Sequence, residues 1–280
     1  TILINADKRS GRRKMIARVP IDLMEVDMTY QREMKNNIVV DVFDEDKCAM
    51  LTLGHRKGEK IFWIIDGQNR AYAALKNGIT DLDAEIFEGT TLEEEAEMFA
   101  MQNNGTKRLH AYDLFKSNVA AGGRNKDSKT AISVKRICDK YNVIVDGSKT
   151  AGHLTGIKEA QDIVNRSGID CLEWIFNVIS VSGWHTKPNV YTSRTMATFE
   201  SVYNSCQDII TKRYYHDNIS NCLRKTDESE IKSYAMFTYR GNKHEIRKMM
   251  RSVMMGIANG SIVYDDISRV NNGNNILVTD

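Results

Sequence analysis

Apolar residues in the first third of the chain form short runs that are typical of β-strands. Strands are expected at Ile16 to Ile21 beside Pro20, at Cys48 to Leu53, at Ile61 to Ile65 and at Leu82 to Phe87. The polar, glycine-containing segment from Gly54 to Lys60 separates the second and third runs. It predicts that these two strands form a hairpin.

Helical spacing appears between and after these strands. A helix is expected over Glu33 to Phe43, and a second over the segment that contains Ala71, Ala74 and Leu75 and stops at Asn77-Gly78. Thr91-Leu92-Glu93-Glu94 has the pattern of a capping box, which predicts a third helix with Phe99 and Ala100 on its apolar face.

From about Leu109 onward the apolar positions recur at helical spacing and the strand pattern nearly vanishes. The polar, glycine-rich segment from Gly122 to Ser128 is the expected linker. The expected fold class is therefore α+β. It comprises a basic arm over residues 1–15, a small α/β domain over 16–122 and a mainly α-helical domain over 123–280.

Composition narrows the class of protein. The 280 residues include 39 Lys plus Arg and 37 Asp plus Glu, so the net charge of +2 argues against a histone-like polybasic binder. The five cysteines form no C-x-x-C pair and the six histidines show no metal-ligand spacing, which argues against a disulfide scaffold or a zinc ribbon. No run approaches the roughly 20 apolar residues of a membrane span. We therefore expect a cytoplasmic protein without membrane contact.

The segment with the clearest chemical meaning is Asp66-Gly67-Gln68-Asn69-Arg70, where a predicted strand ends and a helix begins. The first turn of a helix leaves backbone N–H groups and the positive end of the dipole free for an anion such as phosphate. Gly67 would allow close approach to the ligand, and Arg70 could add a bidentate contact to its oxygens. Asp66 could hold a metal ion or a sugar hydroxyl. An Asp-Gly turn before a helix is also often only a turn.

This region, from about Val19 to Leu114, resembles the ParB/sulfiredoxin-like superfamily, in particular the branch with the string DGQHR. Besides the hairpin, the resemblance rests on Tyr30-Gln31-Arg32, Ile65 to Arg70, Met98 to Asn103, and Lys107-Arg108-Leu109. It implies a small α/β fold that binds nucleotide phosphates after the DGQNR segment, and a protein of a phage or mobile element in a bacterial host. It also implies that Tyr30, Gln31, Gln102 and Asn103 belong to the nucleotide site and that Arg32 is a second phosphate clamp. The alternative role for Arg32 is pairing with surface carboxylates.

Three departures from the family pattern bear on activity. Gln68 stands where sulfiredoxin has its reactive cysteine, which argues against sulfinic-acid reduction. Gln102 stands where partitioning ParB proteins have a magnesium-binding glutamate, and an amide is a poorer magnesium ligand than a carboxylate. Asn69 replaces the histidine of DGQHR, which favours a hydrogen-bond donor to phosphate over an acid or base.

Charged residues elsewhere suggest further sites. Eight acidic residues between Thr80 and Phe99 predict a solvated face or, alternatively, a metal cluster. Lys107 and Arg108 are expected to contact nucleic acid. Near the C-terminus an apolar helical stripe runs from Ile246 to Ile257, and three cations on another face could contact DNA phosphates: Arg247, Lys248 and Arg251. An ordinary amphipathic surface helix is the alternative.

Three functional hypotheses follow. The first is a nucleotide-binding, DNA-associated ParB-like protein whose cofactor is a nucleoside triphosphate, CTP or ATP in the first place, with Mg²⁺ as an optional partner and a homodimer as one arrangement. The second is an NTPase, nuclease or kinase on the same scaffold, with Asp66 as catalytic base or metal ligand. The third is an interaction or inhibitor protein that has lost the ligand.

Overall fold

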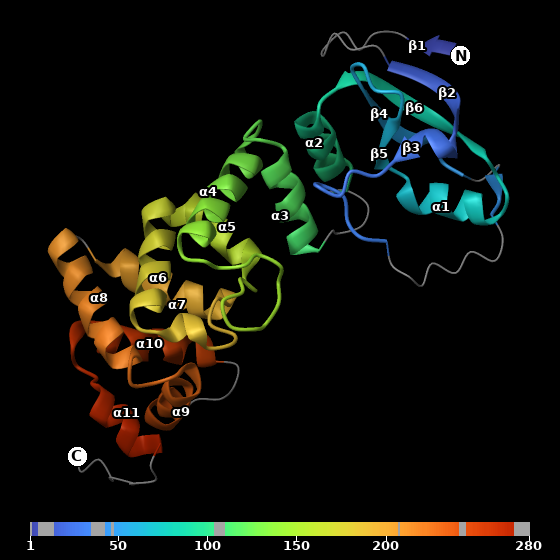
Figure 1. Cartoon of the computed structure of the whole chain (residues 1–280). Helices are drawn as coiled ribbons and strands as arrows, with labels where there is room; N and C mark the ends of the chain where they lie inside the picture. The colour runs from blue at the N-terminus through green and yellow to red at the C-terminus, as the bar shows by residue number, and fades with distance from the viewer. Residues whose placement is uncertain are drawn as a thin grey trace. The chain divides into compact units, whose positions relative to one another are not determined.

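The computed structural model describes residues 2–4, 14–34, 43–45, 48–103, 110–206, 208–240 and 245–271. These residues form two compact units, Thr1–Ile132 and Ser133–Asp280 (Figure 1). The expected α+β class is confirmed, with a mixed sheet in the first unit and helices throughout the second. Most of the basic arm, most of the helix expected over Glu33 to Phe43, and Lys107 with Arg108 lie outside the described residues.

A six-stranded sheet in the order β1-β2-β6-β4-β5-β3 forms the centre of the first unit. Its strands are β1 (Ile2–Ile4), β2 (Lys14–Pro20), β3 (Met24–Glu25), β4 (Leu51–Arg56), β5 (Phe62–Asp66) and β6 (Asp81–Thr90). The hairpin is confirmed, because β4 and β5 pair antiparallel. β6 pairs parallel with β4 and antiparallel with β2, so the sheet is mixed.

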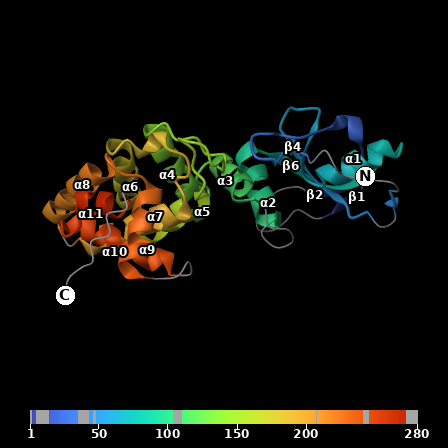
Figure 2. The same ribbon diagram turned by 90° about the horizontal axis from the view of Figure 1, so that it is seen from below.

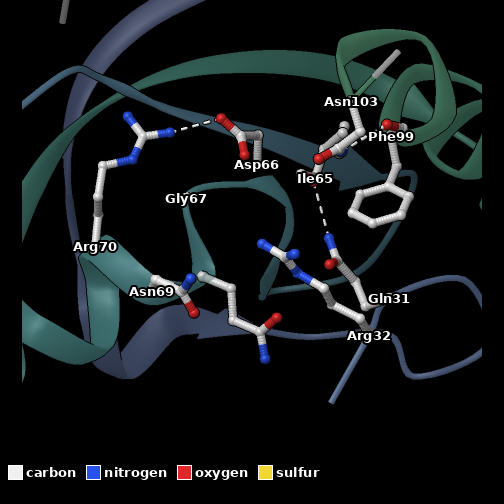
Figure 3. A pocket seen from close by; sticks show the side chains of 10 residues that line it. Gln31, Arg32, Ile65, Asp66, Gly67, Asn69, Arg70, Phe99 and Asn103 are labelled. Atoms are coloured by element: carbon white, nitrogen blue, oxygen red, sulfur yellow. Dashed lines mark hydrogen bonds and ion pairs between the residues drawn. The ribbon is translucent and has the colours of Figure 1, made fainter. Parts of the chain in front are cut away.

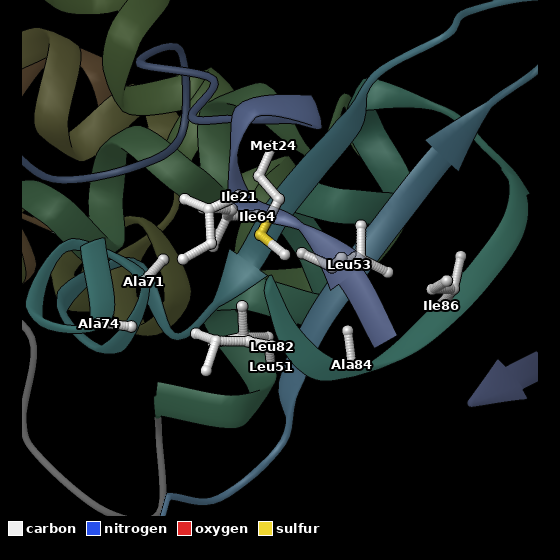
Figure 4. Packing of buried hydrophobic residues seen from close by; sticks show 11 residues of the cluster. Ile21, Met24, Leu51, Leu53, Ile64, Ala71, Ala74, Leu82, Ala84 and Ile86 are labelled. Carbon is white, nitrogen blue, oxygen red and sulfur yellow. The ribbon is translucent and has the colours of Figure 1, made fainter. Parts of the chain in front are cut away.

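Helices cover both faces of this sheet. The chain passes from β5 through α1 (Gln68–Lys76) to β6, and from β6 through α2 (Leu92–Asn103) to α3 (Ala111–Ala120). Ile64 belongs to the core that contains Ala71 and Ala74 of α1 (Figure 4). Its neighbour Ile65 belongs to a second core, with Ala96 and Phe99 of α2. Successive side chains of a strand point to opposite faces, so the end of β5 is held between both helical layers.

One sequence prediction about the strands of this unit needs correction, and one about the helix that follows them is confirmed. Gly54 and the two residues after it belong to β4 instead of the expected turn. A Cβ atom at Gly54 would lie 2.5 Å from Oε1 of Glu95, so the glycine makes room for a buried carboxylate inside the strand. The capping box at Thr91 is confirmed, with its main-chain N–H donating to Glu94 at 3.0 Å and the reciprocal bond at 3.4 Å.

The expected linker is also an ordered part of the first unit. Arg124 pairs with Glu94 and Glu97 of α2, and the side chain of Asn125 accepts a hydrogen bond of 2.8 Å from the main chain of Ser128. That bond stabilises the start of α4 (Lys126–Lys140). The two units therefore divide between Ile132 and Ser133, inside α4, instead of after residue 122. A polar, glycine-rich composition indicated a linker where the residues form a helix cap.

The second unit consists of helices packed around a large apolar core. They are α5 (Ile157–Ser167), α6 (Ile169–Val181), α7 (Ser193–Ser205), α8 (Ile209–Leu223), α9 (Glu228–Tyr239), α10 (Ile246–Asn259) and α11 (Tyr264–Asn271). Figures 1 and 2 show α10 among α7, α8 and α9, all of which it contacts. The predicted apolar stripe of α10 is buried in this core. None of the helices within the described ranges has the length and apolar character needed to cross a membrane.

Candidate functional site

The end of β5 and the start of α1 form one wall of a pocket in the first unit. Gly67 is the N-cap of α1, with φ 106° and ψ 11°, a backbone conformation that side-chain-bearing residues rarely adopt. A Cβ atom there would also lie 2.2 Å from Cδ2 of Leu51. Gly67 is therefore required by the packing of the loop itself, in addition to any approach of a ligand.

The pocket has a volume of about 230 Å³. Its lining residues come from three segments of the first unit: Gln31, Arg32, Ile65, Asp66, Gly67, Gln68, Asn69, Arg70, Phe99 and Asn103. Figure 3 shows Gln31 and Arg32 entering from one side and Asn69 and Arg70 from the other. The structure thus brings together eight of the ten residues that the sequence analysis assigned to this site.

Gln102 and Tyr30 are the two exceptions. Gln102 is exposed outside the pocket, with Nε2 3.5 Å from Oγ1 of Thr52. Tyr30 is fully buried beside Phe99 and is not among the residues that line the pocket. Its side chain instead supports the segment that carries Gln31 and Arg32.

Gln31 joins that segment to β5. Its buried side-chain amide donates hydrogen bonds of 2.8 Å to the main-chain oxygens of Ile64 and of Ile65. On the other side, Nζ of Lys116 in α3 donates to the main-chain oxygen of Gln31 at 3.2 Å. The position of residue 32 is therefore fixed relative to the strand that leads into Gly67.

The two arginines of the pocket are in different states. Nη2 of Arg70 donates to Oδ2 of Asp66 at 2.6 Å, and its Nη1 donates to the main-chain oxygens of Ala49 and Met50, the latter at 2.8 Å. Arg32 makes no hydrogen bond or ion pair with any residue that the structure describes. The surface carboxylate of the alternative role for Arg32 is therefore not found among the described residues, and with respect to those residues the donors of Arg32 are unpaired.

The first turn of α1 faces the same pocket. The first main-chain hydrogen bond at this end of the helix runs from the N–H of Ala71 to the oxygen of Gly67 at 2.9 Å. The N–H groups of Gln68, Asn69 and Arg70 precede it and have no intrahelical acceptor, and α1 has no acidic residue in its first turn. The positive end of the helix dipole therefore lies close to Arg32 without an internal counter-charge other than Asp66.

A buried ion network of Glu95, Arg56 and Asp27 contacts the side chain of Tyr30. Glu95, which is fully buried, accepts hydrogen bonds from Nε and Nη2 of Arg56, the latter at 2.5 Å, and from Oγ1 of Thr90 at 2.7 Å. Nη2 of Arg56 also donates to Oδ2 of Asp27 at 2.7 Å. The hydroxyl of Tyr30 donates to Oε2 of Glu95 at 3.3 Å.

The ionisation of these groups follows from their contacts. Burial, and then the charge of Glu95, raise the pKa of Tyr30, so its hydroxyl stays protonated and donates. Burial alone would lower the pKa of Arg56, but the hydrogen bonds that Arg56 donates to Glu95 and Asp27 outweigh this effect and raise it. Burial acts to raise the pKa of Asp27, yet the hydrogen bonds from Arg56 and Thr29 leave it below its usual value.

The sequence analysis missed this network and placed Glu95 in a solvated or metal-binding acidic segment. Several other acids of that segment pair with cations or histidine of the same unit, among them Asp81 with Arg18, Glu85 with Lys14 and Glu88 with His55. The described residues contain no group of three or more His, Cys, Asp or Glu that could hold a metal ion. Glycine at position 54 inside an apolar strand was the signal in the sequence that a bulky group lies against it.

Three of the five cations predicted to contact nucleic acid lie on α10. Arg247, Lys248 and Arg251 are exposed on α10, while the apolar side of this helix is buried. Lys107 and Arg108 lie outside the described residues.

A comparison of the chain with models of known protein families found no match, and a comparison with curated proteins also found none.

Proposed function

We propose that the first unit binds a nucleoside triphosphate through its phosphate groups, in the pocket between Arg32 and the first turn of α1. The observation that carries this proposal is that one pocket contains both the start of a helix and the guanidinium group of Arg32, which has no partner among the described residues. Guanidinium groups bind phosphate oxygens in bidentate fashion, and backbone N–H groups at a helix start bind the same oxygens.

The size and charge of the pocket favour the phosphates over the rest of a nucleotide. Its volume of about 230 Å³ is below the roughly 300 to 1,000 Å³ of typical small-molecule pockets. Phosphate groups therefore occupy it in our proposal, while the sugar and base lie outside. Arg70 has a positioning role in this account, because its guanidinium group is already held by Asp66 and two main-chain oxygens.

Magnesium has no preformed site in this proposal. Asp66 supplies the carboxylate of the pocket lining, and its Oδ2 accepts a hydrogen bond from Arg70. Mg²⁺ is usually bound by one or two carboxylates together with substrate phosphates. The proposal assigns the metal no residue of this chain.

Association with DNA is the second part of the proposal. It is supported by the three exposed cations of α10, Arg247, Lys248 and Arg251, on a helix whose apolar face is already occupied by the core. Cations held in this way can neutralise DNA phosphates with release of counterions, so affinity for DNA should fall steeply with salt. No specific contact favours the NTPase, nuclease or kinase alternative.

A thermal-shift screen tests the nucleotide proposal. CTP, ATP, GTP and UTP are added separately to the full chain, with and without Mg²⁺ and duplex DNA. Preferential binding to the folded state raises the melting temperature. A rise with at least one nucleotide supports the proposal, whereas an unchanged melting temperature with all four overturns it and favours an interaction protein without a ligand.

A further inference from the structure

A second cavity lies entirely within the helical unit. It has a volume of about 410 Å³ and is lined by three cations, one acid and several hydroxyl or amide groups: Lys149, Thr155, Asn189, Thr192, Ser193, Arg194, Glu228 and Arg247. Its volume is within the range of pockets that hold small molecules.

Four helices begin at this cavity. Thr155 lies two residues before α5, Ser193 is the first residue of α7, Glu228 is the first residue of α9 and Arg247 is the second residue of α10. Each helix start has the equivalent of roughly half a positive charge. The first turns of α5 and α9 contain acidic residues that offset this charge, whereas those of α7 and α10 contain none and favour an anion in the cavity.

The cations of the lining are unpaired with respect to the residues that the structure describes. Neither Lys149, Arg194 nor Arg247 forms a side-chain hydrogen bond or ion pair with another described residue. Nε of Arg194 is buried and has no hydrogen-bond partner among the residues that the structure describes. A buried guanidinium donor is costly to leave unsatisfied, so this atom independently indicates a missing acceptor.

Glu228 limits the charge of the lining. Burial raises the pKa of this carboxyl group, while the charge of Arg194 acts to lower it. With Glu228 ionised, three cations and one carboxylate leave the lining with an excess of two positive charges. This excess matches the dianion of a phosphate monoester.

We propose that this cavity is a binding site for a phosphate monoester group, either on a small molecule or at the end of a polynucleotide. Arg194 and Arg247 bind the phosphate oxygens, and the starts of α7 and α10 add a fixed positive field. This cavity shares no lining residue with the pocket at Arg32, so the two binding proposals are independent of each other.

The test uses isothermal titration calorimetry on the full chain with the background substitution Arg32→Gln, which removes the proposed phosphate-binding cation of the first pocket. The probes are inorganic phosphate, a nucleoside monophosphate, and short single-stranded DNA with either a 5′-phosphate or a 5′-hydroxyl group. Binding of the monophosphate assigns the site to small molecules. Binding of 5′-phosphorylated DNA alone assigns it to polynucleotide ends.

Arg194→Gln and Arg247→Gln should each weaken binding about tenfold, the loss expected for one charge-assisted hydrogen bond. Arg213→Gln, at an exposed arginine of α8 outside the cavity lining and outside the proposed DNA surface, is the matched control and should change affinity less than about twofold. Arg247 is exposed, so its variant remains informative if Arg194→Gln fails to fold. Absence of binding in the background, or an equal loss with Arg213→Gln, overturns the proposal.

Discussion

Gln31 and Ile65 are joined by a hydrogen bond of 2.8 Å from the side-chain amide of Gln31 to the main-chain oxygen of Ile65. Arg32 follows Gln31 directly, and Asp66 and Gly67 follow Ile65. This bond therefore connects the residue that supplies the free cation of the first pocket to the strand that leads into the N-terminus of α1. It makes Gln31 a positioning residue for the proposed phosphate site.

Gln31→Met should separate this positioning role from general packing. Methionine has a similar size but no amide donor, so two buried main-chain oxygens lose a hydrogen bond. We expect a loss of about 1 to 3 kcal/mol in the free energy of unfolding, measured by urea denaturation. Gln102→Met, at an exposed amide, is the matched control and should have an effect within about 0.5 kcal/mol. Equal effects of the two substitutions would contradict the role given to Gln31.

Gly67→Ala should destabilise the first unit whether or not ligand is present. The new Cβ atom would meet Leu51 at 2.2 Å, and the backbone would keep a φ of 106°. We expect a loss of about 2 to 4 kcal/mol in the free energy of unfolding, from the conformational strain together with overpacking. Ala at this position with undiminished stability would show that the loop relaxes freely.

Glu95→Gln should disturb the buried network, because every group that contacts the carboxylate is a donor. The hydroxyl groups of Thr90 and Tyr30 can turn to accept from the amide NH₂ group of glutamine, but the guanidinium group of Arg56 cannot, and it would lose one of its two anionic partners. The expected loss in the free energy of unfolding is about 2 to 4 kcal/mol. Glu93→Gln, at an exposed position of the same helix turn, serves as the control and should change stability by less than about 0.5 kcal/mol.

The contribution of Asp27 to stability should depend on pH. Its pKa in the folded state is below the usual value of 3.8, owing to Arg56 and Thr29 against the opposing effect of burial. Stability from a carboxyl group with a lowered pKa is fully present above its unfolded pKa and is lost as pH falls through the folded value. Denaturation of wild type and Asp27→Asn should therefore show a difference at pH 7 that shrinks below about pH 4. A constant difference over this range would rule out the linkage.

Local patterns were sufficient to predict much of the fold. The capping box at Thr91 and the apolar runs on both sides of Gly58 depend on neighbours in sequence, and the structure contains the expected helix start and hairpin. The segment from Gly122 to Ser128 was misjudged because polar residues in a linker and in a helix cap have the same composition. Only the contacts of Arg124 with Glu97 and of Asn125 with Ser128 show that this segment is a helix cap and not a linker.

The site was predicted in outline, and its internal partners were not. Motif order placed Arg32 and the DGQNR segment together, which the shared pocket agrees with. The pairing of Glu95 with Arg56 depends on a tertiary contact between residues 39 positions apart. Asp66 and Arg70, by contrast, are four residues apart and pair locally. The sequence alone does not distinguish a charged residue that pairs in the interior from one that is exposed to solvent.

The central claim is that Arg32 and the start of α1 hold the phosphates of a nucleoside triphosphate. Calorimetric titration of the nucleotide that gives the largest thermal shift, into wild type, Arg32→Gln and Arg136→Gln, tests it most directly. Arg136 is an exposed arginine in α4 that does not line the pocket, and Arg136→Gln removes the same charge as Arg32→Gln. We predict about tenfold or greater loss of affinity with Arg32→Gln and unchanged affinity with Arg136→Gln. Equal affinities for all three proteins would contradict the claim.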